Sequence, residues 1–141
     1  GAGRRMEKIV DLPNQVVFRD FAHSPSKLEA TTKAVAETYE GNVLAVFELH
    51  TFSSLTKDFL PLYRDAMSSA DRRIVFYNDA VFAHKKMEYL DAEYVKECFG
   101  DVEIINDVQV LESIVNTSFV AGDNILLMSS GTFNKAEFTF S

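Results

Sequence analysis

The sequence predicts an α/β fold, a doubly wound and mostly parallel sheet of the Rossmann-like kind with right-handed crossovers. Uncharged apolar runs typical of buried strands alternate with segments whose apolar residues recur at helical spacing. Polar residues follow the ends of these runs, where open α/β sheets bind ligands. The 141 residues fit one domain and contain no internal repeat or low-complexity linker.

A polar turn between a strand and a helix is the centre of this organisation. Residues 16–18 are uncharged and β-branched or aromatic, and Asp20 and His23 follow them. Ser24 can cap the next helix, and Pro25 suits its first position, where no N–H is needed. The helix N-terminus favours an anion, so this turn is a candidate ligand site. The alternative is that Asp20 only forms the turn and His23 is a surface or packing residue.

The remaining elements continue the alternation of strands and helices. Helices are expected at residues 26–39, 55–66, 91–99 and 107–115, and strands at 9–10, 16–18, 43–47, 73–77, 102–105 and 124–128. The first two strands form either a hairpin or two short edge pieces. Pro61 must kink or restart the second helix, whereas Gly41 and Gly100 end the first and third.

In such a sheet, the residues after each parallel strand gather along one edge. We therefore expect the following side chains to converge: Asp20, His23 and Ser24; Glu48, His50, Thr51, Ser53 and Ser54; Asn78 and Asp79; and Ser129, Ser130 and Thr132. The set is rich in hydroxyls but has no spacing specific to metal ligands and no Cys/His pair placed for nucleophilic catalysis. Asp20 and His23 could contact a metal-bound water or phosphate oxygens, or could instead cap the helix and bond each other.

Composition and charge exclude several classes of protein. With 14 Lys and Arg against 21 Asp and Glu, the formal charge is −7, which argues against a nucleic-acid partner. No apolar run approaches the ~20 residues of a membrane helix, so no membrane partner is expected. The single cysteine, Cys98, excludes an internal disulfide framework and is typical of the reducing cytosol, so we expect a cytoplasmic protein.

The sequence Asp-Phe-Ala-His-Ser-Pro at residues 20–25 resembles the Asp-aromatic-small-His-x-Pro motif that opens the C-terminal domain of Mur ligases. The likeness covers essentially the whole chain, including the Arg-Arg-x-Glu segment at residues 4–7. Met-Ser-Ser-Gly-Thr-Phe at residues 128–133 resembles the ending found in one branch, the murein-peptide ligases. Asp-Phe-Ala-His is also closer to that branch than to the L-alanine-adding ligases, which usually have Asp-Tyr-Gly-His-His-Pro.

This resemblance implies that residues 1–141 are the C-terminal domain of a three-domain, ATP-dependent ligase. The N-terminal domain would hold UDP-N-acetylmuramate, and the central domain would hold ATP and Mg²⁺. The C-terminal domain would close over both and bind the peptide L-Ala-γ-D-Glu-meso-diaminopimelate for peptidoglycan recycling. The muramate carboxylate would be activated as an acyl phosphate and attacked by the peptide amine. No Gly-x-x-x-x-Gly-Lys-Ser/Thr loop is present, so the main phosphate cradle would lie outside this chain, and we expect the chain alone to be inactive.

The resemblance also implies roles for individual residues, carried over by position. Asp20 and His23 would be catalytic, and Arg5 and Asp20 would hold the ribose or phosphates of the nucleotide. The substrate-facing residues would be Ser24, which lies near the acyl phosphate with His23, and His50, Thr51, Ser54, Ser130, Gly131 and Thr132.

Two departures from the family pattern keep alternatives open. Residues 50–54 lack the arginines that L-alanine-adding ligases carry, and Ser24 stands where a second His is frequent. The alternatives are the same domain from an L-alanine-adding or folylpolyglutamate-type ligase, and an α/β binding module without catalysis.

Overall fold

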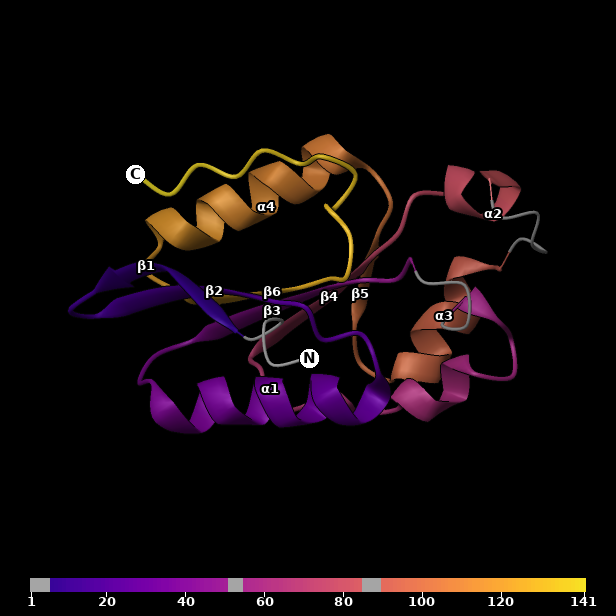
Figure 1. Cartoon of the computed structure of the whole chain (residues 1–141), viewed down its shortest axis with the longest axis horizontal. Helices are drawn as coiled ribbons and strands as arrows, with labels where there is room; N and C mark the ends of the chain where they lie inside the picture. Colours follow the sequence, from indigo (N-terminus) through magenta and orange to yellow (C-terminus); the bar gives the residue numbers. More distant parts are fainter. Residues whose placement is uncertain (1–5, 51–54, 85–89) are drawn as a thin grey trace.

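A computed structural model describes residues 6–50, 55–84 and 90–141 (Figure 1). The sheet has the strand order β1-β2-β6-β3-β4-β5. Its strands are β1 (Glu7–Leu12), β2 (Gln15–Asp20), β3 (Val43–Glu48), β4 (Arg72–Phe76), β5 (Glu103–Ile105) and β6 (Asn124–Met128). Only β1 runs antiparallel to its neighbour, and the other adjacent pairs are parallel. The predicted mostly parallel sheet is therefore confirmed, and the first two strands form the hairpin.

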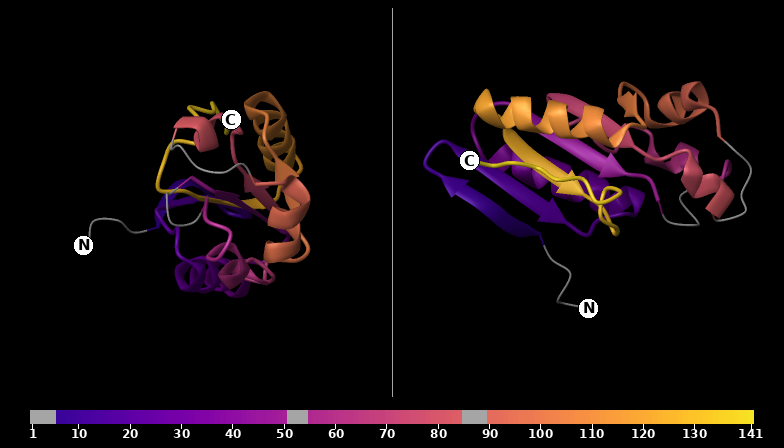
Figure 2. Two further views of the ribbon diagram at one scale, coloured as in Figure 1. Left: turned by 90° about the vertical axis from the view of Figure 1, so that its right-hand side faces the viewer. Right: turned by 90° about the horizontal axis from the view of Figure 1, so that it is seen from above.

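Helices cover both faces of this sheet (Figures 1 and 2). They are α1 (Pro25–Thr38), α2 (Ala80–His84), α3 (Ala92–Phe99) and α4 (Val108–Val120), with a 3-10 turn, η2 (Leu60–Tyr63). α1 lies against one face and α4 against the other. Along β3, Ala45 and Phe47 belong to the α1-side core, whereas Leu44 and Val46 belong to the α4-side core. Alternate side chains of a strand point to opposite faces, so a continuous apolar run fits a sheet buried on both sides.

The prediction of a helix at residues 55–66 was wrong. The described residues there form turns, including the 3-10 turn η2, and Leu62, which an amphipathic helix would bury, is 61% exposed. Pro61 has no N–H to donate and its ring disfavours a continuing α-helix, so the chain packs Leu60 and Tyr63 into the core through successive turns. α2 was not expected, and α4 extends to Val120 instead of ending near residue 115.

The parallel strands end side by side. In the ladders, Asp20 of β2 and Phe47 of β3 both align with Met128 of β6, and Glu48 aligns with Phe76 of β4. The turns that follow β2, β6, β3 and β4 therefore leave the sheet along one edge, as the sequence predicted. This carboxyl edge is where the candidate site lies.

Candidate functional site

Glu48, the last residue of β3, is the polar centre of the carboxyl edge. Its side chain is buried, and Oε1 accepts hydrogen bonds from Ser129 Oγ at 2.6 Å and from the Phe133 N–H at 2.8 Å. Ser129 Oγ in turn accepts the Gly131 N–H at 2.7 Å. We call these three bonds the Glu48 network. A buried carboxylate is costly unless hydrogen-bonded, so the network both satisfies Glu48 and fixes the turn after β6 to the end of β3.

That turn forms one wall of a pocket of about 510 Å³. The pocket is lined by Glu48, Leu49 and His50 after β3, by Asn78, Ala80 and Val81 at the start of α2, and by Gly131, Thr132 and Asn134 after β6. Gly131 lets its backbone approach the imidazole closely, because a Cβ there would lie 2.8 Å from His50 Nε2. A larger hollow of about 790 Å³ opens at the opposite edge, between the β1–β2 turn and the end of α1, away from the converging strand ends.

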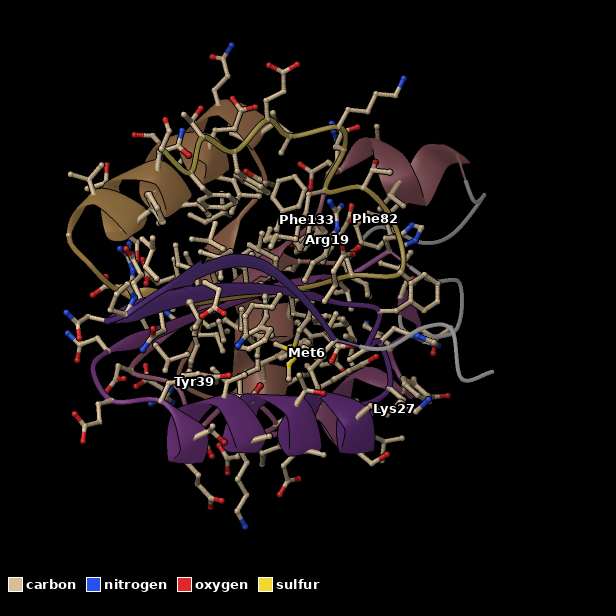
Figure 3. The ribbon with its side chains drawn as sticks, turned by 60° about the vertical axis from the view of Figure 1, so that its left-hand side comes forward. Met6, Arg19, Lys27, Tyr39, Phe82 and Phe133 are labelled. Atoms are coloured by element: carbon tan, nitrogen blue, oxygen red, sulfur yellow. The ribbon has the colours of Figure 1, made fainter. Side chains whose placement is uncertain are left out.

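The backbone beyond the wall is strained. Phe133, Asn134 and Lys135 have φ values of 54°, 53° and 60°, in the left-handed region. For residues other than glycine, this conformation costs about 1–2 kcal/mol each. Phe133 anchors the segment, since its fully buried ring lies between the C-terminal tail and the sheet, near Phe76 and Phe138 (Figure 3). Strain of this kind persists only where the surrounding contacts enforce it, and it clusters at binding sites.

The turn after β2 is held by its own backbone and by its neighbours. Asp20 is buried, and its Oδ1 accepts the Ala22 N–H at 3.1 Å. The backbone N–H of Ser129 donates to the Asp20 carbonyl at 2.9 Å and so joins this turn to the one after β6. His23 Nδ1 lies 3.3 Å from the Phe21 carbonyl oxygen. Asp20 and His23 thus bond backbone groups of their own turn, and the alternative in which they bond each other is not what the geometry shows.

Ser24 and Pro25 begin α1, as expected, but the cap differs from the prediction. Ser24 occupies the N-cap position with extended dihedral angles, yet its side chain makes no capping hydrogen bond. Pro25 occupies the first helical turn, where its missing N–H costs nothing. The prediction that the Ser24 side chain caps the helix was therefore wrong. The Asp20 side chain closes the turn before the helix, and the Leu28 N–H donates to the Ser24 carbonyl at 2.9 Å.

Tyr63 of η2 supports the His23 turn from beneath. Its hydroxyl donates a hydrogen bond to the His23 carbonyl oxygen. The ring is fully buried and stacks on Phe99 with 4.9 Å between ring centroids, so the hydroxyl is held in place. The sequence does not reveal this contact, because the apolar spacing of residues 55–66 predicts one amphipathic helix and gives the Tyr63 hydroxyl no role.

The family model described as "Mur ligase, glutamate ligase domain" matches residues 4–131. The chain belongs to the Mur ligase family, as a C-terminal domain. It is 30% identical over 140 residues to a UDP-N-acetylmuramate–L-alanine ligase of Caldicellulosiruptor saccharolyticus, covering 96% of this chain and 30% of that protein. The chain thus spans about a third of the curated relatives it matches.

Solved Mur ligase structures share the fold of this chain. A murein peptide ligase from Psychrobacter arcticus superimposes with a TM-score of 0.65 at 23% identity, over 96% of this chain and 28% of that one. A domain from a putative UDP-N-acetylmuramate:L-alanyl-γ-D-glutamyl-diaminopimelate ligase of Haemophilus ducreyi superimposes with a TM-score of 0.59 at 23% identity. The match covers 94% of this chain and 93% of that one. The second was crystallised as a domain of nearly this size.

The predicted site residues of this Mur ligase domain fall into four groups. His50, Gly131 and Thr132 come together at the pocket. Asp20, His23 and Ser24 lie at the neighbouring turn, on the same edge but outside the pocket lining. Ser130 is adjacent to the wall, and its hydroxyl is buried with no hydrogen-bond partner in the part of the chain that the structure describes. Arg5, Thr51 and Ser54 lie outside the described residues.

Three polar residues that line the pocket were not among the predicted site residues. Glu48 and Asn78 were expected at the edge but given no role, and Asn134 was not considered. For Glu48 the signal was available, since a carboxylate directly after the apolar run 43–47 must be buried and therefore needs partners. Asn134 gave no comparable signal.

Electrostatic features of this domain lie mostly away from the pocket. Arg72 donates two hydrogen bonds to Glu103 and holds the pKa of that carboxyl below its usual value, but the pair sits where β4 and β5 begin.

Among residues 6–50, 55–84 and 90–141, no three His, Cys, Asp or Glu side chains gather as metal ligands would. In the same ranges, no helix has the length and apolarity that crossing a membrane requires.

Proposed function

We propose that this chain is the C-terminal, substrate-closing domain of a longer ligase that joins L-Ala-γ-D-Glu-meso-diaminopimelate to UDP-N-acetylmuramate. The pocket beside His50 is the observation that carries this proposal. Its volume of about 510 Å³ lies in the range that accepts a drug-sized ligand and far exceeds what free L-alanine would fill. The Met-Ser-x-Gly-x-Phe ending at residues 128–133, which resembles that of murein-peptide ligases, contributes Gly131 and Thr132 to the wall of the same pocket.

The two neighbouring turns would divide the work. The pocket would hold the peptide, with its amine directed toward the muramate carboxyl carbon. The turn of Asp20 and His23 stands at the N-terminus of α1, whose dipole favours an anion such as an acyl phosphate. The bond between the Ser129 N–H and the Asp20 carbonyl fixes the distance between the two turns. Attack of the amine on the acyl carbon would then form the amide bond and release phosphate.

ATP and Mg²⁺ would be held mainly by other domains of the full-length ligase. The described residues of this chain do not fit a magnesium site of their own, because they contain no cluster of carboxylates. ATP would supply the phosphoryl group that activates the muramate carboxylate. Within this chain, Asp20 and Arg5 are the proposed contacts to the nucleotide, and His23 and Ser24 the proposed neighbours of the reacting group.

A ligase for free L-alanine is the second candidate function. It is favoured by the curated relative from Caldicellulosiruptor saccharolyticus, an L-alanine ligase that is 30% identical to this chain. Against it, residues 50–54 contain no arginine.

Phosphate release by the full-length ligase tests the two candidates directly. We would supply UDP-N-acetylmuramate, ATP and Mg²⁺ with either the tripeptide or L-alanine, and compare the wild type with H50A. Release with the tripeptide alone, and a raised KM for it in H50A, is the expected result. The exposed Glu29 of α1 offers a control, E29Q, which should behave as the wild type. Release with L-alanine alone would replace the proposed substrate, and release with neither would favour a binding module without this activity.

A further inference from the structure

Glu48 is a buried acid, and among the residues that the structure describes its side-chain hydrogen bonds join one segment, residues 129–133. Oε1 accepts hydrogen bonds from the Ser129 hydroxyl and from the Phe133 N–H, and Ser129 Oγ accepts a hydrogen bond from the Gly131 N–H. The two ends of the pocket wall are therefore tied to a single oxygen atom at the end of β3. A buried carboxyl group is costly unless it is hydrogen-bonded, so these bonds favour the observed position of the turn.

The strained residues follow directly after this attachment. Phe133 is both the last donor of the Glu48 network and the first of the three residues with positive φ. Thr132 and Asn134, on either side of it, line the pocket. The left-handed turn thus gives the pocket its shape at this wall, and the Glu48 network is one of the contacts that enforce it.

We propose that Glu48 is a positioning residue for the amine substrate. It holds the turn after β6 so that Gly131 and Thr132 form the pocket wall beside His50, and Ser129 relays this constraint. The inference rests on the proposed function, because it assigns the amine substrate to this pocket. Glu48 acts through the wall and takes no part in proton transfer or bond formation.

Steady-state kinetics of the full-length ligase would separate positioning from a general loss of structure. S129A removes the hydrogen bonds that join Glu48 to Ser129 and Ser129 to Gly131. It leaves the bond between the Phe133 N–H and Glu48 in place, so the fold should persist. We expect its KM for the tripeptide to rise about tenfold, as loss of a hydrogen bond to a charged group predicts, with KM values for ATP and UDP-N-acetylmuramate within about twofold of wild type. S26A, at an exposed position of α1, is the matched control and should change none of these constants.

Two variants of Glu48 itself test whether a residue that can still accept the hydrogen bonds preserves the KM for the tripeptide. E48Q keeps an oxygen that can accept both bonds, so its KM should stay within a few-fold of wild type, whereas E48A should show a rise at least as large as that of S129A. Equal increases in all three KM values, or a loss confined to kcat, would overturn the inference.

The wall can also be observed without turnover. In ¹H–¹⁵N spectra of the 141-residue chain, S129A should shift the amide resonance of Gly131 while that of Phe133 stays near its wild-type position, and E48A should shift both. If the wild-type ligase turns over no amine, the proposed function fails, and these spectra still judge whether Glu48 holds the wall. Unshifted Gly131 and Phe133 resonances in E48A would refute the positioning role in either case.

Discussion

The backbone N–H of Phe133 donates to Glu48 Oε1 at 2.8 Å, although 85 residues separate the two along the chain. The bond joins the end of the central strand β3 to the first residue of a left-handed turn. Because Thr132 and Asn134 flank Phe133 and line the pocket, this hydrogen bond from a backbone N–H to a side-chain carboxyl group connects the core of the sheet to the shape of the site. The geometry of the pocket therefore depends on the fold more than on its exposed residues.

Gly131→Ala should raise the KM for the amine substrate and change the free energy of unfolding by less than about 1 kcal/mol. The added Cβ would lie 2.8 Å from His50 Nε2 and 3.1 Å from Glu48 Oε1, so the imidazole, as the movable group, must turn aside. Kinetics of the full-length ligase and urea unfolding of the chain measure the two effects. In the H50A background, where the ring is gone, the further change G131A should raise the KM less than it does in the wild type, because only the contact at 3.1 Å from Glu48 Oε1 remains. A KM unaltered by G131A would show that this wall does not contact the substrate.

Tyr63→Phe should destabilise the chain by about 1 kcal/mol and shift the His23 ring resonances. The variant keeps the ring stacked on Phe99 but removes the hydroxyl that donates to the His23 carbonyl. Y94F is the matched control, since the Tyr94 hydroxyl donates to the Lys57 carbonyl at the surface, at 2.8 Å. Y94F should lower the free energy of unfolding by less than ~0.5 kcal/mol. Equal losses in the two variants, with His23 unmoved, would contradict the support that we assign to Tyr63.

The sequence predicted the strands, their alternation with helices and the edge at which the polar turns meet. It could do so because β3 and its neighbours are continuous apolar runs, and the ends of parallel strands must lie together. It did not predict the Glu48 network, whose partners lie 81 and 85 residues away and become neighbours only through strand order. It also missed the role of Tyr63, because local apolar spacing at residues 55–66 does not distinguish a helix from a series of turns.

Lys135→Gly should stabilise the chain by up to about 1 kcal/mol. Lys135 is exposed and has a φ of 60°, a conformation that costs a residue with a Cβ about 1–2 kcal/mol. Glycine removes this cost, although its greater freedom in the unfolded chain offsets part of the gain. K135A retains the Cβ and should leave the stability unchanged, so it separates backbone strain from loss of the lysine charge. A urea midpoint raised equally in both variants would argue against the strain.

Acid should remove the stabilisation that Glu103 contributes. The two Arg72 bonds, at 2.7 and 3.0 Å, lower the pKa of Glu103 in the folded chain. The contribution is therefore fully present above the ordinary carboxyl pKa of about 4.3 and is lost as the pH falls through the lower, folded value. Both side chains are 47% exposed, so solvent screening limits the effect to less than about 1 kcal/mol. E103Q should be slightly less stable than wild type to urea at pH 7, and the two stabilities should converge as the pH falls below the lowered, folded pKa of Glu103.

The 141-residue chain alone should release no phosphate from ATP in the presence of Mg²⁺, UDP-N-acetylmuramate and tripeptide. The sequence carries no Gly-x-x-x-x-Gly-Lys-Ser/Thr loop, so we expect the proposed activation of the muramate carboxylate to need the phosphate cradle of another domain. The absence of turnover must not come from misfolding, so circular dichroism and a cooperative thermal transition are the controls. Phosphate release by the folded chain that disappears in H23A would show that this domain activates the acid by itself, and would require a nucleotide site within it.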